Sequence, residues 1–206
     1  MPWLPLFLPL CWPFCWWILV VVDHYSRAIV HVAVFSGQPS SADVCAALAD
    51  VVGRATGPPK YLVTDQGAQF QDEYRRWCAS AGIKPRFGAI GKHGSIAVVE
   101  RLHRTLKSEC LRRFVLPLRK EAMLAELELA ARWYNEHRPH ARHHGATPAE
   151  IRDGMKPAKD EPRFETRERF APAAKLRAQP GVKLALDLQF LEGRPHLPIV
   201  ALKQAA

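Results

Sequence analysis

The stretch LVTDQGAQF, residues 62–70, places an acid directly after a short apolar run and before a glycine turn. Residues 60–64 predict a strand, Gln66 and Gly67 predict a turn, and residues 68–81 have the spacing of a helix. An acid at the carboxyl end of a strand is typical of the edge where an open α/β sheet builds its site. Asp65 is therefore the first candidate functional residue.

The segments on either side extend this pattern to an α/β fold. Upstream, β-rich runs at 15–22 and 28–35 are joined by a short polar turn, which predicts an antiparallel hairpin. The other expected elements are a helix over 42–54, a strand over 84–90, a loop at 91–95, and helices over 96–114 and 119–136. This order predicts a mixed sheet with helices packed on its faces.

A second acid, Glu100, lies early in the helix expected over 96–114. The helix and strand between the two acids are long enough to return Glu100 to the end of the Asp65 strand. Two carboxylates placed in this way can share divalent metal ions, as two-metal phosphoryl transfer requires. The same pattern also permits a structural interpretation, in which Asp65 caps the following helix and Glu100 complements the helix dipole.

Basic residues follow Glu100 on the same helix. Arg104 is four residues on and Lys107 seven residues on, so they share its helical face, with His103 beside them. Cations next to a metal-binding carboxylate suit a DNA phosphate held over the ions. An intrahelical ion pair between Glu100 and Arg104 explains part of this pattern, and it contributes only about 0.3–0.5 kcal/mol.

Several blocks, taken together and in order, resemble the catalytic core shared by retroviral integrases and bacterial insertion-sequence transposases. They are VVVDHYSRAIVHVAVF (20–35), LVTDQGAQF (62–70), AGIKPRFGAIGKHGSIAVVERLHRTLKSE (81–109), WYNEHRPH (133–140) and ATPAEI (146–151). The resemblance covers roughly residues 15–151. It implies a ribonuclease H-like fold and a mobile-element protein that cuts DNA ends with water and joins them to a target strand.

The resemblance also implies roles for individual residues. Such cores carry an Asp-Asp-Glu triad that binds Mg²⁺ or Mn²⁺, and here Asp65 matches the second acid and Glu100 the third. Arg104 and Lys107 match positions that hold donor DNA near the metals, and we add His103 to this DNA-binding group. The active family works as oligomers on DNA, which implies element ends, target DNA and further copies of the chain as partners.

The first acid of the triad has no counterpart. In the family it lies on the first strand of the sheet, in a Trp-x-x-Asp-x-Thr context, whereas residues 1–22 contain no Asp or Glu and Asp23 falls at the turn of the hairpin. The usual amino-terminal helix-turn-helix region is also missing, and Ser95-Ile96 replaces a common Asp-Asn pair. We therefore expect an amino-terminally truncated transposase with an incomplete metal site that is inactive alone. The alternative is a non-catalytic DNA-binding remnant.

The charge distribution favours a polyanionic partner. The net charge is +9, with 8 basic and 7 acidic residues in 1–100 but 21 and 13 in 101–206. Residues 1–22 are uncharged and long enough to span a bilayer, but recurring prolines at 2, 5, 9 and 13 argue against a membrane helix. We expect no membrane association and a cytoplasmic location.

The remaining features predict structure rather than a second site. The five cysteines lack disulfide or zinc-site spacing, which favours buried apolar roles. The His-rich tract with His137, His140, His143 and His144 is interpreted as a strap after the core, with a zinc site as the weaker alternative. The predicted organisation is a proline-rich lead-in (1–14), an incomplete core (15–151), a basic linker (152–180) and a small β region (181–206).

Overall fold

The computed structural model describes residues 2–3, 16–54, 57–88, 95–113, 117–155 and 184–204. The chain divides into two compact units, each described by itself below: unit 1 is Met1–His24 with Ile29–Leu127, and unit 2 is Tyr25–Ala28 with Glu128–Ala206. No helix in the described part of the chain is long and apolar enough to cross a membrane.

The predicted hairpin forms in unit 1. Strand β2 (Trp16–Val22) pairs antiparallel with β3 (Ile29–Phe35), from Trp17 opposite Phe35 to Val22 opposite Ile29, with an irregularity between Val21 and Val22. Its Trp, Val and Ile side chains favour a pleated, half-buried surface. The other edge of β2 pairs only with the two-residue strand β1 (Pro2–Trp3), at Trp17 and Trp16.

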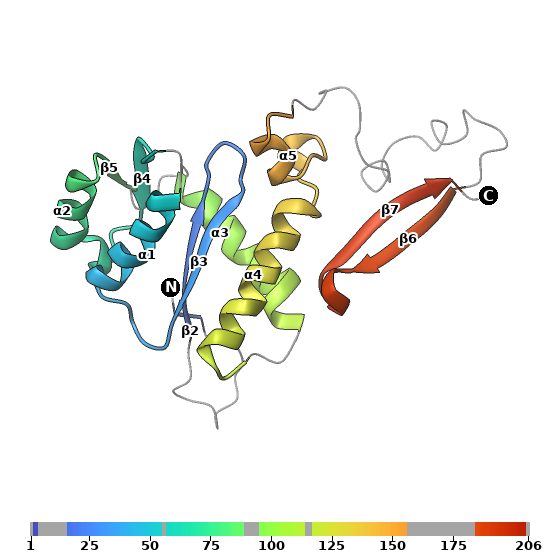
Figure 1. Cartoon of the computed structure of the whole chain (residues 1–206), viewed down its shortest axis with the longest axis horizontal. Helices are drawn as coiled ribbons and strands as arrows, with labels where there is room; N and C mark the ends of the chain where they lie inside the picture. Colours follow the sequence, from blue (N-terminus) through green and yellow to red (C-terminus); the bar gives the residue numbers. More distant parts are fainter. Residues whose placement is uncertain are drawn as a thin grey trace. The chain divides into compact units, whose positions relative to one another are not determined.

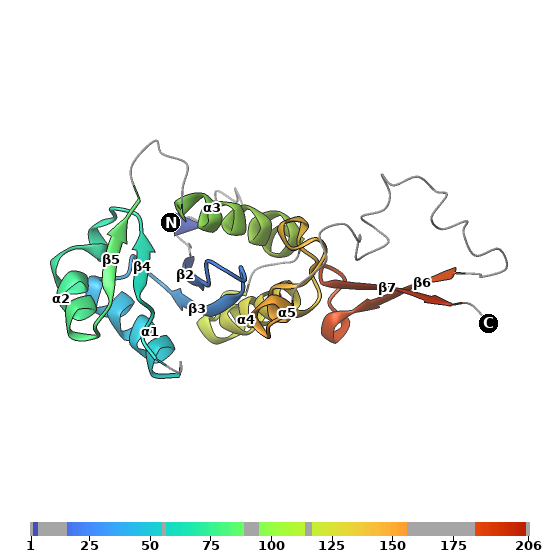
Figure 2. The same cartoon turned by 90° about the horizontal axis from the view of Figure 1, so that it is seen from above.

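The strands around the candidate site form a separate sheet. Strand β4 (Tyr61–Thr64) pairs in parallel with β5 (Lys84–Phe87), and both views show the two side by side (Figures 1 and 2). The expected mixed sheet is therefore divided into an antiparallel and a parallel part, because no strand among the described residues joins β2 to β4. Residues 89–94, which include most of the predicted loop, lie outside the described part.

Helices α1 (Ser41–Arg54) and α2 (Asp72–Ser80) cover one face of the β4–β5 sheet. Ser40 caps the start of α1: its hydroxyl accepts a hydrogen bond from the Asp43 N–H at 3.2 Å. The helix predicted over 68–81 is divided into a 3₁₀ turn η2 (Ala68–Phe70) and α2, which is followed by Gly82 with a φ of +70°. Helices α1 and α2 and the turn η2 share one core with the residue that directly precedes β5. It consists of Val44, Cys45, Leu48, Phe70, Tyr74, Cys78 and Ile83, with Leu62 and Phe87 packed against it.

The helix predicted over 96–114 is not a continuous α-helix. It consists of α3 (Ser95–Thr105), a π-helical turn η3 (Leu106–Cys110) and a 3₁₀ turn η4 (Leu111–Arg113). The Ser108 hydroxyl donates to the Arg104 carbonyl at 2.8 Å, and such back-bonding competes with the regular ladder. The following helix, α4 (Lys120–Glu136), matches its predicted range closely.

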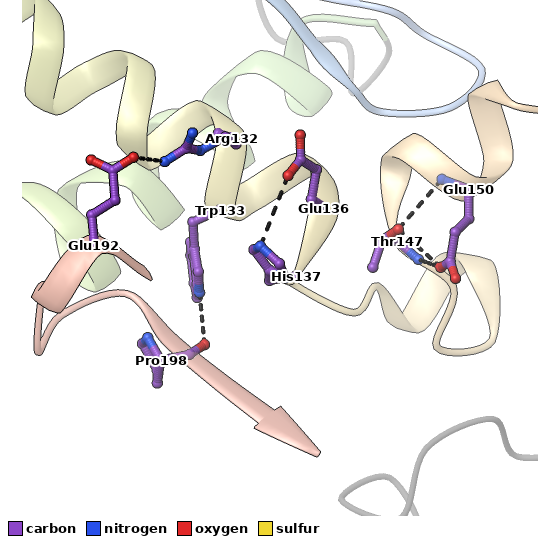
Figure 3. A network of polar contacts seen from close by, with 8 residues as sticks. All are labelled: Arg132, Trp133, Glu136, His137, Thr147, Glu150, Glu192 and Pro198. Carbon is purple, nitrogen blue, oxygen red and sulfur yellow. Dashed lines mark hydrogen bonds and ion pairs between the residues drawn. The ribbon is translucent and has the colours of Figure 1, made fainter. Parts of the chain in front are cut away.

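Unit 2 contains a short helix and a terminal hairpin. Helix α5 (Pro148–Arg152) begins in the segment after the core, and Thr147 and Glu150 form a capping box. The predicted hairpin is present as β6 (Leu184–Phe190) and β7 (Pro198–Gln204), joined through a 3₁₀ turn η7 (Leu191–Gly193). Within the unit, the Trp133 indole donates to the Pro198 carbonyl at 2.8 Å, and Arg132 pairs with Glu192 (Figure 3).

Candidate active site

Asp65 lies directly after β4 and is exposed at the surface of unit 1. Its Oδ1 accepts a hydrogen bond from the Gly67 N–H at 3.0 Å, which closes a turn of two residues. This contact differs from the alternative in which Asp65 caps the following helix, because η2 and α2 have no side-chain cap. The carboxylate is therefore held by the backbone turn and directed away from the core.

Tyr74 is a core residue of unit 1 close to Thr64, the last residue of β4. This residue of α2 is fully buried and packs edge-on against Phe70, with ring centroids 5.2 Å apart. Burial is the main cause that raises the pKa of Tyr74 above its usual range, while the Thr64 hydroxyl acts in the opposite direction. The hydroxyl oxygens of Thr64 and Tyr74 are both buried, and neither has a hydrogen-bond partner among the described residues. The sequence pattern did not single out either residue as part of the site.

Glu100 is exposed on α3, which contacts β4 within unit 1. His103 lies one helical turn after Glu100. It is close enough to Asp65 for the charge of that carboxylate to affect the pKa of His103. The charge of Asp65 acts to raise the pKa of His103, although burial lowers it more. Helix α3 and strand β4 are therefore in contact, and the convergence of Asp65 and Glu100 stays a prediction.

The three residues predicted to bind DNA, His103, Arg104 and Lys107, have different surroundings. Arg104 is exposed like Glu100 four residues earlier. His103 and Lys107 are partly buried instead, and both line an apolar hollow against Ile18 and Val20 of β2. Burial, reinforced by the charge of Lys107, lowers the pKa of His103 to about 4. His103 is therefore uncharged at neutral pH, so any contact of its ring with DNA is that of a neutral group.

The described residues do not assemble a metal centre. Carboxylates are the right ligands for Mg²⁺ or Mn²⁺, but no group of three or more His, Cys, Asp or Glu side chains is gathered in the described ranges. Asp23, at the turn between β2 and β3, does not form such a group with Asp65 and Glu100. Within the described residues, Asp65 and Glu100 alone supply fewer fixed carboxylate oxygens than a two-metal site needs.

The histidines of the predicted strap have different surroundings in unit 2, and the rings of His140 and His143 lie 5.9 Å apart between centroids. His143 is buried, with Nε2 at 3.0 Å from the Ser26 carbonyl oxygen, and burial lowers its pKa. His140 packs edge-on against Tyr134 at 4.8 Å between ring centroids. His137 faces Glu136 at 3.9 Å (Figure 3), and His144 is exposed with a φ of +50°. These contacts are structural ones.

Comparison with known proteins identifies the family. Two family models, both described as integrase core domain, match residues 8–93 and 81–148. The catalytic core domain of BIV integrase is 26% identical, with a TM-score of 0.52, over 65% of this chain and 83% of that one. No curated protein matches the chain.

Two further solved structures are similar at lower sequence identity. A chain of the simian T-cell lymphotropic virus intasome, solved with the PP2A regulatory subunit B56 gamma, is 18% identical with a TM-score of 0.57, over 93% of this chain and 63% of that one. The HTLV-2 integrase catalytic core domain, solved with magnesium in a dimeric form, is 22% identical with a TM-score of 0.48, over 67% and 83%. The motifs, the ribonuclease H-like fold and the family matches agree, and the chain belongs to the integrase core family.

Proposed function

We propose that this protein acts in DNA integration as a transposase-like or integrase-like protein of a mobile element, and that this polypeptide alone does not catalyse strand transfer. The observation that supports the proposal is the match to the integrase core domain, together with the contact between β4, which ends just before Asp65, and α3, which carries Glu100. In the proposed roles, Asp65 and Glu100 are catalytic and metal-binding residues.

The expected lack of activity follows from the number of ligands. A pair of Mg²⁺ or Mn²⁺ ions needs several fixed oxygens to compete with water, and a ligand that bridges both ions contributes most. Asp65 already uses one carboxylate oxygen on the Gly67 N–H. With two acids, the site is expected to hold metal too weakly for the reaction.

DNA binding is expected to survive without catalysis. Arg104 is exposed beside Glu100, and Lys107 lies one turn further along, so both can contact backbone phosphates near the acids. His103 is proposed as a neutral neighbour of this contact. The partners that follow are DNA and further copies of the chain, because integration has to bring element ends together with a target.

A strand-transfer assay tests the proposal. The full chain is incubated with a labelled DNA duplex and a supercoiled plasmid, in Mg²⁺ and separately in Mn²⁺, while binding to the duplex is followed by fluorescence anisotropy. We expect binding without joined product, and weaker binding for Arg104→Ala and Lys107→Ala. The matched control is Arg54→Ala, which removes a cation of α1 that pairs with Asp50 at 2.9 Å.

Joined product would contradict the expected inactivity, and its loss in Asp23→Ala would identify Asp23 as the substitute acid. Binding that is unaffected by Arg104→Ala and Lys107→Ala would contradict the proposed DNA contact.

The alternative function, a non-catalytic DNA-binding remnant, is favoured by the lack of a three-ligand group in the described residues. The encoding DNA separates the two, because only an intact gene continues upstream in frame into a Trp-x-x-Asp-x-Thr block.

A further inference from the structure

The outer face of the β4–β5 sheet carries basic and aromatic side chains. In the parallel register, Tyr61 lies opposite Lys84 and Val63 opposite Arg86. Residues opposite each other share a face of a sheet, and neighbours along a strand alternate between faces. Leu62 therefore points the other way, into the core under α1 and α2, as does Phe87.

Aromatic contacts hold the cations of this face in place. The Arg86 guanidinium carbon lies 3.8 Å from the centroid of the Tyr61 ring, and the Lys60 ammonium lies 5.5 Å from the same centroid. Both distances fall within the range of cation–π interactions. The ring thus orients the guanidinium while Arg86 remains exposed to solvent.

The same cations lack acidic partners in the described part of the chain. Lys60, Lys84 and Arg86 are all exposed, and no carboxylate of the described residues is within 4.0 Å of their charged groups. Arg54, by comparison, pairs with Asp50 at 2.9 Å. Lys60 and Arg86 lie over the Tyr61 ring, and Lys84 lies opposite Tyr61 in the sheet register, so positive charge is concentrated on this face of the sheet.

We propose that this surface, formed by Lys60, Tyr61, Lys84 and Arg86, is a second DNA-binding site that takes backbone phosphates. A guanidinium stacked on a ring keeps its N–H donors at the rim, where they match two oxygens of a phosphate. A lysine on either side adds point charges suited to neighbouring phosphates. The inference rests on the proposed function, since it takes DNA as the partner, but it concerns other residues than Arg104 and Lys107.

Salt dependence provides the sharpest test. Each phosphate contact contributes about 0.9 to the slope of log affinity against log salt concentration on duplex DNA. With the full chain and a labelled duplex, we expect Lys60→Ala, Lys84→Ala and Arg86→Ala each to weaken binding severalfold and to reduce the slope by about 1. The matched control Arg54→Ala should leave the slope unchanged, and circular dichroism should show native helix content in every variant.

Two substitutions at one position separate charge from support. Tyr61→Phe retains the ring and is expected to bind DNA like the unaltered chain. Tyr61→Leu removes the ring beneath Arg86 and is expected to weaken binding with little change in the salt slope, because all three cations remain. Equal binding by Tyr61→Leu and Tyr61→Phe would show that the ring does not orient Arg86, and would overturn that part of the inference.

The outcomes distinguish this inference from the proposed function. If Arg104→Ala and Lys107→Ala weaken binding while the three sheet variants do not, the second site is wrong and the proposed function stands. If the chain does not bind DNA at all, both are wrong. If the sheet variants lose binding of poly-glutamate but retain binding of DNA, the surface is a site for an acidic peptide, and the inference is again wrong.

Discussion

His103 shows how much the surroundings of a single residue change its chemistry. Its sequence position beside Glu100 and Arg104 suggests a polar, DNA-facing role, but its ring lines an apolar hollow against β2. Burial disfavours the charged imidazolium and lowers the pKa of His103 to about 4. Arg104, the next residue, is exposed and keeps its charge outside this hollow.

We predict that His103 makes the protein less stable in mild acid. The unfolded chain has an ordinary histidine pKa of about 6.5 and binds the proton more readily than the folded chain, so stability is complete above pH 6.5 and is lost as the pH falls toward 4. From pH 7 to 5 the free energy of unfolding should decrease by about 1–2 kcal/mol more in the unaltered chain than in His103→Gln. Urea unfolding at both pH values measures this.

His143, whose pKa burial also lowers, is present in both proteins and cancels in that comparison. An identical pH dependence for the unaltered chain and His103→Gln would show that the His103 ring is protonated as easily in the folded state as in the unfolded one.

At the scale of elements, local hydrogen bonds determine where helices begin and change form. Helix α5 has only five residues and depends on its start. The Thr147 hydroxyl accepts from the Glu150 N–H at 3.4 Å, and the Glu150 carboxylate accepts from the Thr147 N–H at 2.8 Å (Figure 3). After α3, by contrast, the helix changes form. The Ser108 hydroxyl donates to the Arg104 carbonyl, and Ser108 lies in the π-helical turn η3.

We predict that Thr147→Val destabilises unit 2 by about 1 kcal/mol, because valine keeps the shape of threonine but cannot accept from the Glu150 N–H. Thr147→Ser keeps the hydroxyl and should remain within a few tenths of a kcal/mol of the unaltered chain. Hydrogen exchange of residues 148–155 reports the effect locally. Equal loss of protection in both variants would show that packing of the threonine methyl group, and not the cap, stabilises α5.

At the level of the whole molecule, the net charge of a segment does not show where positive charge is concentrated on the surface. Residues 1–100 have 8 basic and 7 acidic residues and are nearly neutral in sum. The same half nevertheless contains the basic surface of β4 and β5, because its acids lie elsewhere. A polyanion is therefore expected to contact both halves of the sequence and not the second alone.

We predict that the core of unit 1 unfolds in a single cooperative transition. Cys45, Cys78 and Cys110 are buried, free thiols, and burial raises the pKa of Cys45 and Cys78. We expect all three to resist iodoacetamide at neutral pH and to become labelled together at the urea midpoint, as peptide mass mapping can show. Labelling of Cys45 at lower urea than Cys110 would instead indicate that α1 and α3 unfold separately.

Most helices and strands and their order, the position of Asp65 at the end of β4, and the resemblance to integrase cores could be predicted from the sequence alone. These features follow from short-range periodicity, turn residues and ordered motifs, which a linear chain records directly. Only the tertiary structure decided the division of the sheet, the burial of His103, and the contact between Arg86 and Tyr61. Each of these depends on which distant segments become neighbours, and pairing register between strands separated by a helix has no local signal in the sequence.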